Sequence, residues 1–287
     1  MIKYSIILRV YNADKQVSRS IESIINQSYA NWELIIINDG STDGTGEICE
    51  KYALKDQRIV VVHQKNKGCL LATLTGVEHS TGDYICLIDS DDWYEKEYIE
   101  KVNFVFCTQK VDMVVTNYNV IGTANEKKKF CLVEEDCITD KREAIKKFLE
   151  TTNYALWNKF IAKDRIRYTK EELNFYKSSG KATNFGDDLF LLMPVLSGCE
   201  KIYFISQCLY NYTIGEQSIS HKATKDDGEE LINRSRLMQF VYETIEQNGL
   251  MDQEIHKLIQ VDTVVVLMPN IKNMIKSGQI EKTLLRS

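Results

Sequence analysis

The chain has 287 residues, of which 44% are hydrophobic and 27% are charged, and its formal net charge at pH 7 is −5. This composition is typical of a soluble globular chain of one large or two small domains. It excludes a strongly basic protein that binds nucleic acid, since the basic run Lys127–Lys129 is short and is more typical of a solvated turn or an edge strand.

The first third of the chain alternates apolar runs with segments of helical spacing. The apolar runs predict strands at residues 4–10, 33–37, 58–62 and 84–88. Between them, apolar residues recur at helical spacing within 17–25 and 48–52. This alternation predicts a mostly parallel sheet with helices on both faces, an α/β half of the nucleotide-binding type.

The predicted strand at 33–37 runs into Asn38–Thr45, a segment that combines carboxylates, glycines and small hydroxyls. Asp39 can accept a hydrogen bond from an imide N–H such as that of uracil, and Gly40 lets the backbone approach a ligand closely. A well-capped turn before a helix is the alternative.

Three carboxylates, Asp89, Asp91 and Asp92, directly follow the predicted strand at 84–88. Carboxylates this close repel one another, and a hard divalent cation or a raised pKa relieves the repulsion. The alternative is a helix that begins near Trp93 and is capped by Ser90 or Asp92. Because α/β proteins bind ligands at the carboxyl ends of their strands, we expect this segment and Asn38–Thr45 to form one site.

Beyond about residue 110 the alternation loosens. Residues 111–120 predict a strand, 141–150 a helix and 201–214 a strand rich in tyrosine. The last sixty residues have the spacing of amphipathic helices separated near Asn248-Gly249. We therefore expect a compact body, divided at about residue 110, with a helical extension over 226–287.

The cysteines and the apolar stretches indicate the compartment. None of the eight cysteines forms a Cys-x-x-Cys pair, and Cys86 and Cys107 lie in apolar runs, which predicts reduced core thiols. The sequence has no stretch of eighteen apolar residues and too few apolar residues after Met1 for a signal peptide. We expect a cytoplasmic protein.

Two sets of motifs match a known family in order and in spacing. The dense set consists of Ser5–Asn12, Ser23–Tyr29, Ile37–Asp43, Thr81–Tyr84 and Asp89–Asp92. The sparser set consists of Leu156–Lys159, Gly186–Asp188, Leu209–Tyr212 and Ser218–Ser220. With these motifs the chain resembles the family 2 glycosyltransferases.

The resemblance implies a GT-A fold, with a mostly parallel, Rossmann-like sheet flanked by helices. It implies the transfer of a sugar, with inversion, from a nucleotide diphosphate donor, usually a UDP-sugar, to a hydroxyl of a glycan or a lipid-linked saccharide, as in the synthesis of a bacterial surface polysaccharide. Residues 1–110 then form the nucleotide-sugar-binding half, 111–225 the acceptor and catalytic-base half, and 226–287 the C-terminal extension.

The resemblance also implies roles for single residues. Asp91 is the expected ligand of Mn²⁺ or Mg²⁺, with Asp89 nearer the ribose or a metal-bound water. His221 is a further metal ligand, with a surface or packing histidine as the alternative. The expected donor-binding residues are Val10, Tyr11, Asn12, Asp39, Ser41, Lys67, Asp89, Ser90 and Asp91.

The expected general base is Asp188, which would take the proton of the acceptor hydroxyl. Asp187 takes the place of a glutamate in relatives, and Asp187 and Trp157 are expected at the acceptor or the sugar. The alternatives are an acidic helix start for the two aspartates and a core position for the tryptophan.

The chain departs from the family pattern at four positions. Arg9 stands where proline is usual, Thr73-Leu74 where Arg-Asn is usual, and Thr213 where arginine is common. The loss of two basic groups near a diphosphate would either weaken ground-state binding or shift charge neutralisation to the metal or to other cations, for which the candidates are Arg9, Lys159 and Lys222.

Two other classes of function stay open. A catalytically degenerate relative would bind a nucleotide or a partner glycosyltransferase without turnover, although intact Asp39, Asp91 and Asp188 argue against it. A nucleotidyltransferase would need a glycine-rich loop after the first strand, and the segment from Arg9 to Lys15 has no glycine.

A lipid-linked acceptor would bring the enzyme to the inner face of the membrane, where the C-terminal helices could dock. Alternatively, these helices could form a homodimer.

Overall fold

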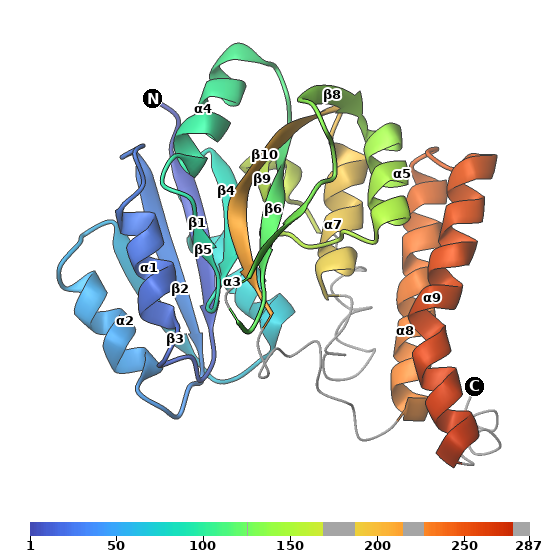
Figure 1. Ribbon diagram of the computed structural model, residues 1–287, viewed down its shortest axis with the longest axis horizontal. Coiled ribbons are helices and arrows are strands. Elements are labelled where there is room, and N and C mark those ends of the chain that lie inside the picture. The colour runs from blue at the N-terminus through green and yellow to red at the C-terminus, as the bar shows by residue number, and fades with distance from the viewer. Residues whose placement is uncertain (125, 169–186, 215–226, 278–287) are drawn as a thin grey trace. The chain divides into compact units, whose positions relative to one another are not determined.

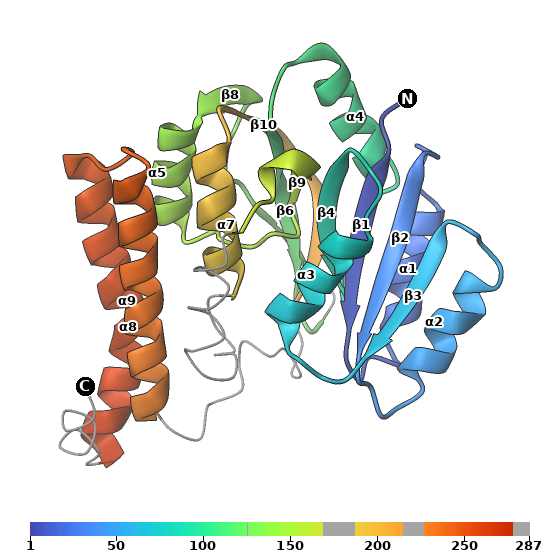
Figure 2. The ribbon, with the colours of Figure 1, turned by 180° about the vertical axis from the view of Figure 1, so that it is seen from behind.

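The computed structural model describes residues 1–124, 126–168, 187–214 and 227–277 (Figures 1 and 2). The chain forms two compact units. The first comprises Met1–Asp140, Ala155–Ile166 and Cys199–Glu216, and the second comprises Lys141–Tyr154, Arg167–Gly198 and Gln217–Ser287. The three domain ranges expected from the sequence stay a prediction.

The first unit is built on one mixed sheet, which has ten strands within the described residues. The strands are β1 (Tyr4–Val10), β2 (Trp32–Asp39), β3 (Ile59–Gln64), β4 (Tyr84–Asp89), β5 (Trp93–Tyr94), β6 (Met113–Ile121), β7 (Lys127–Phe130), β8 (Cys137–Asp140), β9 (Lys159–Ala162) and β10 (Lys201–Thr213). Their order is β3-β2-β1-β4-β9-β6-β10-β5, with β7 paired to β6 and β8 to β10. Strands β1 to β4 are parallel, and β9 joins them to β6 by antiparallel pairing on both of its sides.

Helices cover both faces of the parallel strands. They are α1 (Val17–Ile25), α2 (Thr45–Ala53), α3 (Cys69–His79) and α4 (Tyr98–Thr108), and a short 3₁₀ helix η1 (Lys163–Arg165) follows β9. Figure 1 shows α1 in front of the parallel strands, and Figure 2 shows α3 in front of the opposite face. Strand β1 lies between β2 and β4 and beneath helices, so it is buried almost throughout and its apolar run is continuous.

The α/β fold predicted from the alternation is confirmed. Strands β2, β3 and β4 each extend one or two residues past the predicted end, because the backbone pairing continues through polar residues such as Asp39 and Asp89. The helix considered as an alternative near Trp93 does not form, since Trp93–Tyr94 is β5 and α4 begins at Tyr98.

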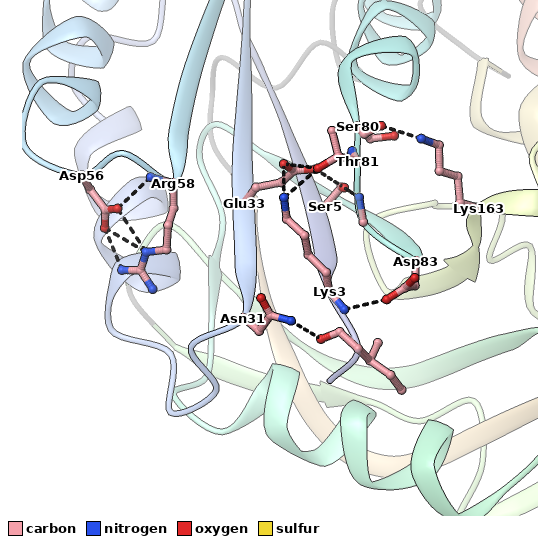
Figure 3. Close-up of polar contacts among 12 residues, drawn as sticks. Lys3, Ser5, Asn31, Glu33, Asp56, Arg58, Ser80, Thr81, Asp83 and Lys163 are labelled. Atoms are coloured by element: carbon pink, nitrogen blue, oxygen red, sulfur yellow. Dashed lines mark hydrogen bonds and ion pairs between the residues drawn. The ribbon is translucent and has the colours of Figure 1, made fainter.

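Polar side chains tie the amino ends of β1 and β2 to the segment before β4 (Figure 3). Glu33 Oε2 accepts hydrogen bonds from Lys3 Nζ at 2.7 Å and from Thr81 Oγ1 at 2.8 Å. Glu33 Oε1 accepts from Ser5 Oγ and from the backbone N–H of Thr81, each at 2.6 Å. The backbone N–H of Lys3 donates to Asp83 at 2.8 Å. Four donors therefore converge on one carboxylate, which we call the Glu33 cluster.

The second unit is helical within the described residues. Its helices are α5 (Lys141–Thr151), α7 (Asp187–Gly198), α8 (Asp227–Gln247) and α9 (Gln253–Ser277). Helix α8 packs on α7 and α9, and α5 packs on α9. Phe190 stacks on Phe240 with ring centroids 4.5 Å apart, and Tyr154 donates a hydrogen bond of 2.5 Å to buried Asp262. In the part of the chain that the structure describes, no helix combines the length and the apolar character needed to cross a bilayer.

None of the eight cysteines forms a disulfide bond. Cys86 is buried as expected, but the core position expected for Cys107 is wrong, since its side chain is exposed. Helix α4 turns Val102, Val105 and Phe106 toward the core, and the helical period leaves Cys107 on the outer side.

Candidate functional site

The register of the parallel strands brings the two predicted polar segments to one edge of the sheet. Strand β1 pairs with β2 so that Val10 lies beside Asn38, and it pairs with β4 so that Arg9 lies beside Asp89. The segments that follow β2 and β4 therefore flank the carboxyl end of the same strand. This is the usual position of a ligand site in a parallel α/β sheet.

Asp92 anchors the acidic loop, which we define as Asp89–Asp92, to strand β10. Its side chain is fully buried and accepts hydrogen bonds from Tyr210 Oη at 2.6 Å and from the backbone N–H of Thr213 at 2.7 Å. Ser20 Oγ donates to the carbonyl of Asp92 at 2.7 Å. Burial raises the pKa of Asp92 well above its usual range, and the neighbouring Asp89 and Asp91 raise it further.

Asp89 and Asp91 lie half-buried in the same loop. Burial, and then the charge of Asp89, raise the pKa of Asp91 from 3.8 to about 6. The loop therefore concentrates negative charge that its surroundings compensate only in part. An added cation would lower the free energy of the ionised form of Asp91.

The residues of the loop fit a hard divalent cation, but only with ligands from elsewhere. Carboxylate oxygens such as those of Asp89 and Asp91 are the donors that Mg²⁺ and Mn²⁺ prefer. Within the described residues, however, no three His, Cys, Asp or Glu side chains converge as a complete metal site. A cation here would take its remaining ligands from water or from a bound diphosphate, as Mg²⁺ commonly does.

Asp39 is held by the loop that follows β3. Its Oδ1 accepts from Gln64 Nε2 at 2.7 Å and from the N–H of Lys67 at 2.9 Å, and its Oδ2 accepts from the N–H of Gly68 at 2.9 Å. The side chain is only 5% exposed. A carboxylate accepts about four hydrogen bonds, so Oδ2 retains capacity for one ligand donor.

The ends of β1 and β2 are bonded to each other. The N–H of Asn12 donates to Ser41 Oγ at 3.1 Å, and Asn12 Oδ1 accepts from the N–H of Thr42 at 2.8 Å. Asn12 adopts a left-handed backbone conformation with φ of 49°, which asparagine tolerates better than most residues. Val10 is buried, whereas the ring of Tyr11 is 49% exposed beside this joint.

Trp157 and Lys159 lie in the interior of the first unit. The indole ring of Trp157 is 6% exposed and stacks on Tyr210 and Tyr212, with centroids 4.3 and 5.2 Å away. Trp157 therefore has the core position, which is compatible with the role at the acceptor or the sugar that stays a prediction. Lys159 is fully buried, and its ammonium donates to the carbonyl of Ala155 at 2.5 Å and to Asn158 Oδ1 at 2.9 Å. Its ammonium holds the backbone before β9, which argues against Lys159 as a cation for a diphosphate.

The remaining predicted residues belong to the second unit or lie outside the described residues. Asp187 and Asp188 begin helix α7, and Asp188 is half-buried. His221 and Lys222 lie outside the described residues, as does Ser218–Ser220. The roles of these residues stay predictions.

Three contributors to the site carry no role in the sequence interpretation. Gln64 positions Asp39, and Tyr210 positions Asp92. Arg19 in α1 donates to the carbonyl of Asp91. An arginine inside the apolar run of β1 was a readable signal for Arg9, and Tyr210 lies in the motif Leu209–Tyr212, which carried no assigned role. Gln64 and Arg19 come from ordinary positions that no local pattern marks.

Comparisons with known proteins agree with this geometry. The family model described as glycosyl transferase family 2 matches residues 5–183. The glycosyltransferase GlyA of Streptococcus pneumoniae serotype 4 (strain ATCC BAA-334 / TIGR4) is 32% identical over 232 residues, which cover 78% of this chain and 32% of GlyA. GlyG of the same strain is 37% identical over 115 residues, which cover 40% of this chain and 38% of GlyG. The matched regions thus span only about a third of these two proteins.

Among solved structures, residues 1–349 of TarS from S. aureus share the fold. The complex of TarS with UDP-GlcNAc superposes with a TM-score of 0.71 at 17% identity, over 96% of this chain and 73% of that chain. The complex of TarS with UDP has a TM-score of 0.65 at 18% identity, over 100% of this chain and 75% of that chain. The predicted GT-A fold is thereby confirmed.

Proposed function

Because this chain belongs to glycosyl transferase family 2, we propose that it transfers a sugar from a nucleotide diphosphate to a hydroxyl group of a glycan or a lipid-linked saccharide. The observation that carries the proposal is the meeting of Asp39 and the acidic loop at the carboxyl edge of one parallel sheet. The first candidate donor is a UDP-sugar, in view of the UDP-GlcNAc and UDP bound to TarS.

The donor's base would lie against the end of β2. Asp39 Oδ2 has the capacity to accept the imide N–H of uracil, and the exposed ring of Tyr11 offers a surface for stacking. Asn12 and Ser41 brace this part of the site, with buried Val10 behind them. Lys67, whose backbone holds Asp39 and whose side chain is exposed, is a cation within the same loop.

The ribose and the diphosphate would lie against the acidic loop. Asp91 is the proposed ligand of Mn²⁺ or Mg²⁺, with Asp89 and Ser90 nearer the ribose, and His221 is a further proposed ligand. When bound, a divalent cation stabilises the negative charge that grows on the departing diphosphate. The buried carboxylate of Asp92 fixes the loop to β10, so Asp91 is presented from a rigid support.

The acceptor side of the reaction rests on Asp188. As general base it would take the acceptor proton on the face of the sugar opposite the leaving group, which gives inversion. Asp187 is its proposed neighbour at the acceptor. Trp157, whose ring stacks on Tyr210 and Tyr212 in the first unit, is a further residue proposed for the acceptor or the sugar. We place the reaction in the cytoplasm, at the inner face of the membrane if the acceptor is lipid-linked.

The test is a thermal-shift panel of UDP, GDP, CDP and TDP and their sugar conjugates, each with Mn²⁺ and with chelator. A ligand at a hundred times its Kd adds about 2.7 kcal/mol to the stability of the folded protein, so the midpoint should rise by several degrees. Stabilisation by one nucleotide, with a larger effect when Mn²⁺ is present, would support the proposed donor site. A flat response to the whole panel would contradict it.

A second measurement separates the enzyme from a binding protein that has lost its activity. Asp188→Asn should keep the affinity for the donor and reduce the transfer rate by about a hundredfold to ten-thousandfold, the usual contribution of a general base. Transfer by this variant at the wild-type rate would exclude Asp188. Donor binding by the wild type without transfer or hydrolysis would favour the degenerate relative.

A further inference from the structure

We propose that Arg9 and Arg19 form a pair of guanidinium groups that grips the acidic loop from two sides and supplies the positive charge for the donor's diphosphate. Arg9 comes from strand β1 and Arg19 from helix α1. The inference rests on the proposed function and adds two residues to it. Arg9 is the positioning residue of the pair, and Arg19 is the member that can touch the phosphates.

Arg9 is a buried cation in a strand that is otherwise almost wholly apolar. Its side chain is 8% exposed, and its guanidinium lies 2.5 Å from Asp89 Oδ1 in an ion pair. A second nitrogen donates to Thr73 Oγ1 at 3.2 Å, and this hydroxyl donates in turn to the carbonyl of Cys69 at 3.0 Å. Burying a guanidinium costs free energy unless it is paired and hydrogen-bonded, and these contacts offset that cost for Arg9 in β1.

Close packing of α3 on β1 makes the contact with Thr73 possible. A Cβ on Gly76 would lie 2.4 Å from Cγ2 of Ile7, so only glycine allows the helix to approach this far. Ile7 and Arg9 are two residues apart on the strand and therefore share the face that meets α3. Arg9 is thus held between α3 and the acidic loop.

Arg19 grips the other part of the loop. Its guanidinium donates to the carbonyl oxygen of Asp91 and, at 3.3 Å, to Thr213 Oγ1, and it lies 4.0 Å from the ring centroid of Trp93. Thr213 Oγ1 also donates to the same carbonyl at 2.8 Å. Unlike Arg9, Arg19 is exposed, so its remaining N–H groups can reach a phosphate.

Each arginine contacts a threonine at a position where the resemblance implies an arginine. Thr73 accepts a hydrogen bond from Arg9, and Thr213 accepts one from Arg19. A guanidinium therefore lies beside both positions, supplied by β1 and by α1. In this inference the two basic groups are relocated to these elements and are not lost.

The first test compares ligands with and without phosphate. UDP and uridine are titrated calorimetrically, in the presence of Mn²⁺, into the wild type, Arg9→Met and Arg19→Gln. We expect each variant to bind UDP at least about tenfold more weakly, Arg19→Gln because it loses a charged donor to the phosphates and Arg9→Met because the acidic loop loses its ion pair with Asp89. Uridine, which carries no phosphate, should bind Arg19→Gln as it binds the wild type, and Arg9→Met should lose less affinity for uridine than for UDP.

Arg58→Gln is the matched control. Arg58 also lies over a tryptophan, 3.6 Å from the ring centroid of Trp32, and pairs with Asp56 at 2.7 Å, but it precedes β3 at the amino edge of the sheet. This variant should bind UDP like the wild type. Equal losses of UDP and uridine affinity in Arg9→Met and Arg19→Gln would mean a merely structural role and would overturn the inference, as would unchanged UDP binding.

The second test moves the guanidinium back to α3. In Arg9→Ala combined with Thr73→Arg, the new guanidinium starts from the position that Arg9 now contacts. The affinity for UDP should therefore recover to within about threefold of the wild type, whereas Arg9→Ala alone should bind UDP weakly. A double variant that binds UDP as weakly as Arg9→Ala, with an unchanged thermal midpoint, would contradict the relocation.

If Arg9 variants do not fold, Arg19→Gln at the surface still decides the role of the pair. A wild type that binds no nucleotide contradicts the proposed function itself, whereas a wild type that binds UDP with unaffected variants contradicts only this inference.

Discussion

At the two ends of the parallel strands, the pKa of a carboxylate is shifted in opposite directions. At the amino ends, burial alone would raise the pKa of Glu33, but hydrogen bonds from Lys3, Ser5 and Thr81 outweigh it and lower the pKa from 4.5 to about 2. At the carboxyl ends, burial and the charge of Asp89 raise the pKa of Asp91 from 3.8 to about 6. Both side chains are partly buried on one sheet, so the number of donors around each carboxylate decides the sign.

This contrast separates stability from ligand binding. The Glu33 cluster matches its charge with donors from three residues on two segments and is complete without any ligand. The acidic loop keeps negative charge in excess, which lowers the stability of the free protein and raises its affinity for a cation. Changes at the amino end should therefore alter unfolding alone, and changes at the carboxyl end should alter binding more than unfolding.

The largest effect is expected for Asp91→Asn. The variant should lose more than about a hundredfold in Mn²⁺-dependent affinity for the donor, since even indirect contacts to a metal are commonly worth ten- to a hundredfold. Its thermal midpoint without ligand should equal or exceed that of the wild type, because a repelled carboxylate is removed. Titration of UDP with Mn²⁺ and with chelator checks this, and an unchanged metal dependence would remove Asp91 as a ligand.

Glu33→Gln should have the opposite profile. We expect a loss of about 1.5 to 3 kcal/mol in the free energy of unfolding, measured in urea, because charged hydrogen bonds are broken within a part-buried cluster. Donor affinity should not change. The control is Glu97→Gln, which removes an exposed carboxylate paired with Lys101 at 3.3 Å and should cost less than about 0.5 kcal/mol. A loss of donor affinity in Glu33→Gln would contradict the claim that the amino ends of the strands affect stability alone.

The two ends should also respond to acid in opposite directions. Asp91 has a higher pKa when folded than when unfolded, so the free protein should gain stability as the pH falls from about 6 toward 3.8. Glu33 has a lower pKa when folded, so its contribution is complete above 4.5 and is lost as the pH falls toward about 2. Urea denaturation with chelator between pH 3 and pH 8 checks both. Asp91→Asn should reduce the gain, of which the raised pKa of Asp92 supplies the rest, and Glu33→Gln should remove the loss. A profile with the same slope in all three proteins would refute the assignment.

The smallest effect is expected for Lys3→Met. Lys3 is 37% exposed on its side chain, and an ion pair of this kind is worth at most about 1 kcal/mol. Its loss should raise the midpoint of the Glu33 acid transition slightly and should matter less in high salt. A large effect that persists in high salt would mean that the lysine contributes through packing rather than through charge.

Much of the fold follows from local pattern. The strands of the first half are continuous apolar runs because β1, β2 and β4 are buried on both faces, so these runs were enough to find them. The pairing of β9 between β4 and β6 was not readable, since Lys159–Ala162 has only four residues and follows a helix of the other unit. Long-range pairing of a short strand leaves no periodic signal.

The site residues that are consecutive in the sequence were predictable, whereas those brought together from distant segments were not. Asp39 and the acidic loop each lie in a run of polar residues at a strand end, so their meeting could be expected. The groups that hold them, Gln64, Tyr210 and Arg19, come from positions 25 to 121 residues away. Gln64 and Arg19 look ordinary in their own segments, and the motif that contains Tyr210 does not reveal its partner. Cys107 shows the converse error, because an apolar run on a helix does not bury every member.

The Asp39 carboxylate has two tasks, because it accepts hydrogen bonds from the loop after β3 and is also the group proposed to recognise the base. Any substitution there removes a recognition group and at the same time releases the N–H groups of Lys67 and Gly68. Evolution of a new base preference should therefore avoid Asp39 at first and begin at Tyr11, which is exposed beside the site. A library that randomises Tyr11 should yield altered nucleotide selectivity in single steps, whereas one that randomises Asp39 should need compensating changes in the loop after β3 before any variant folds and binds.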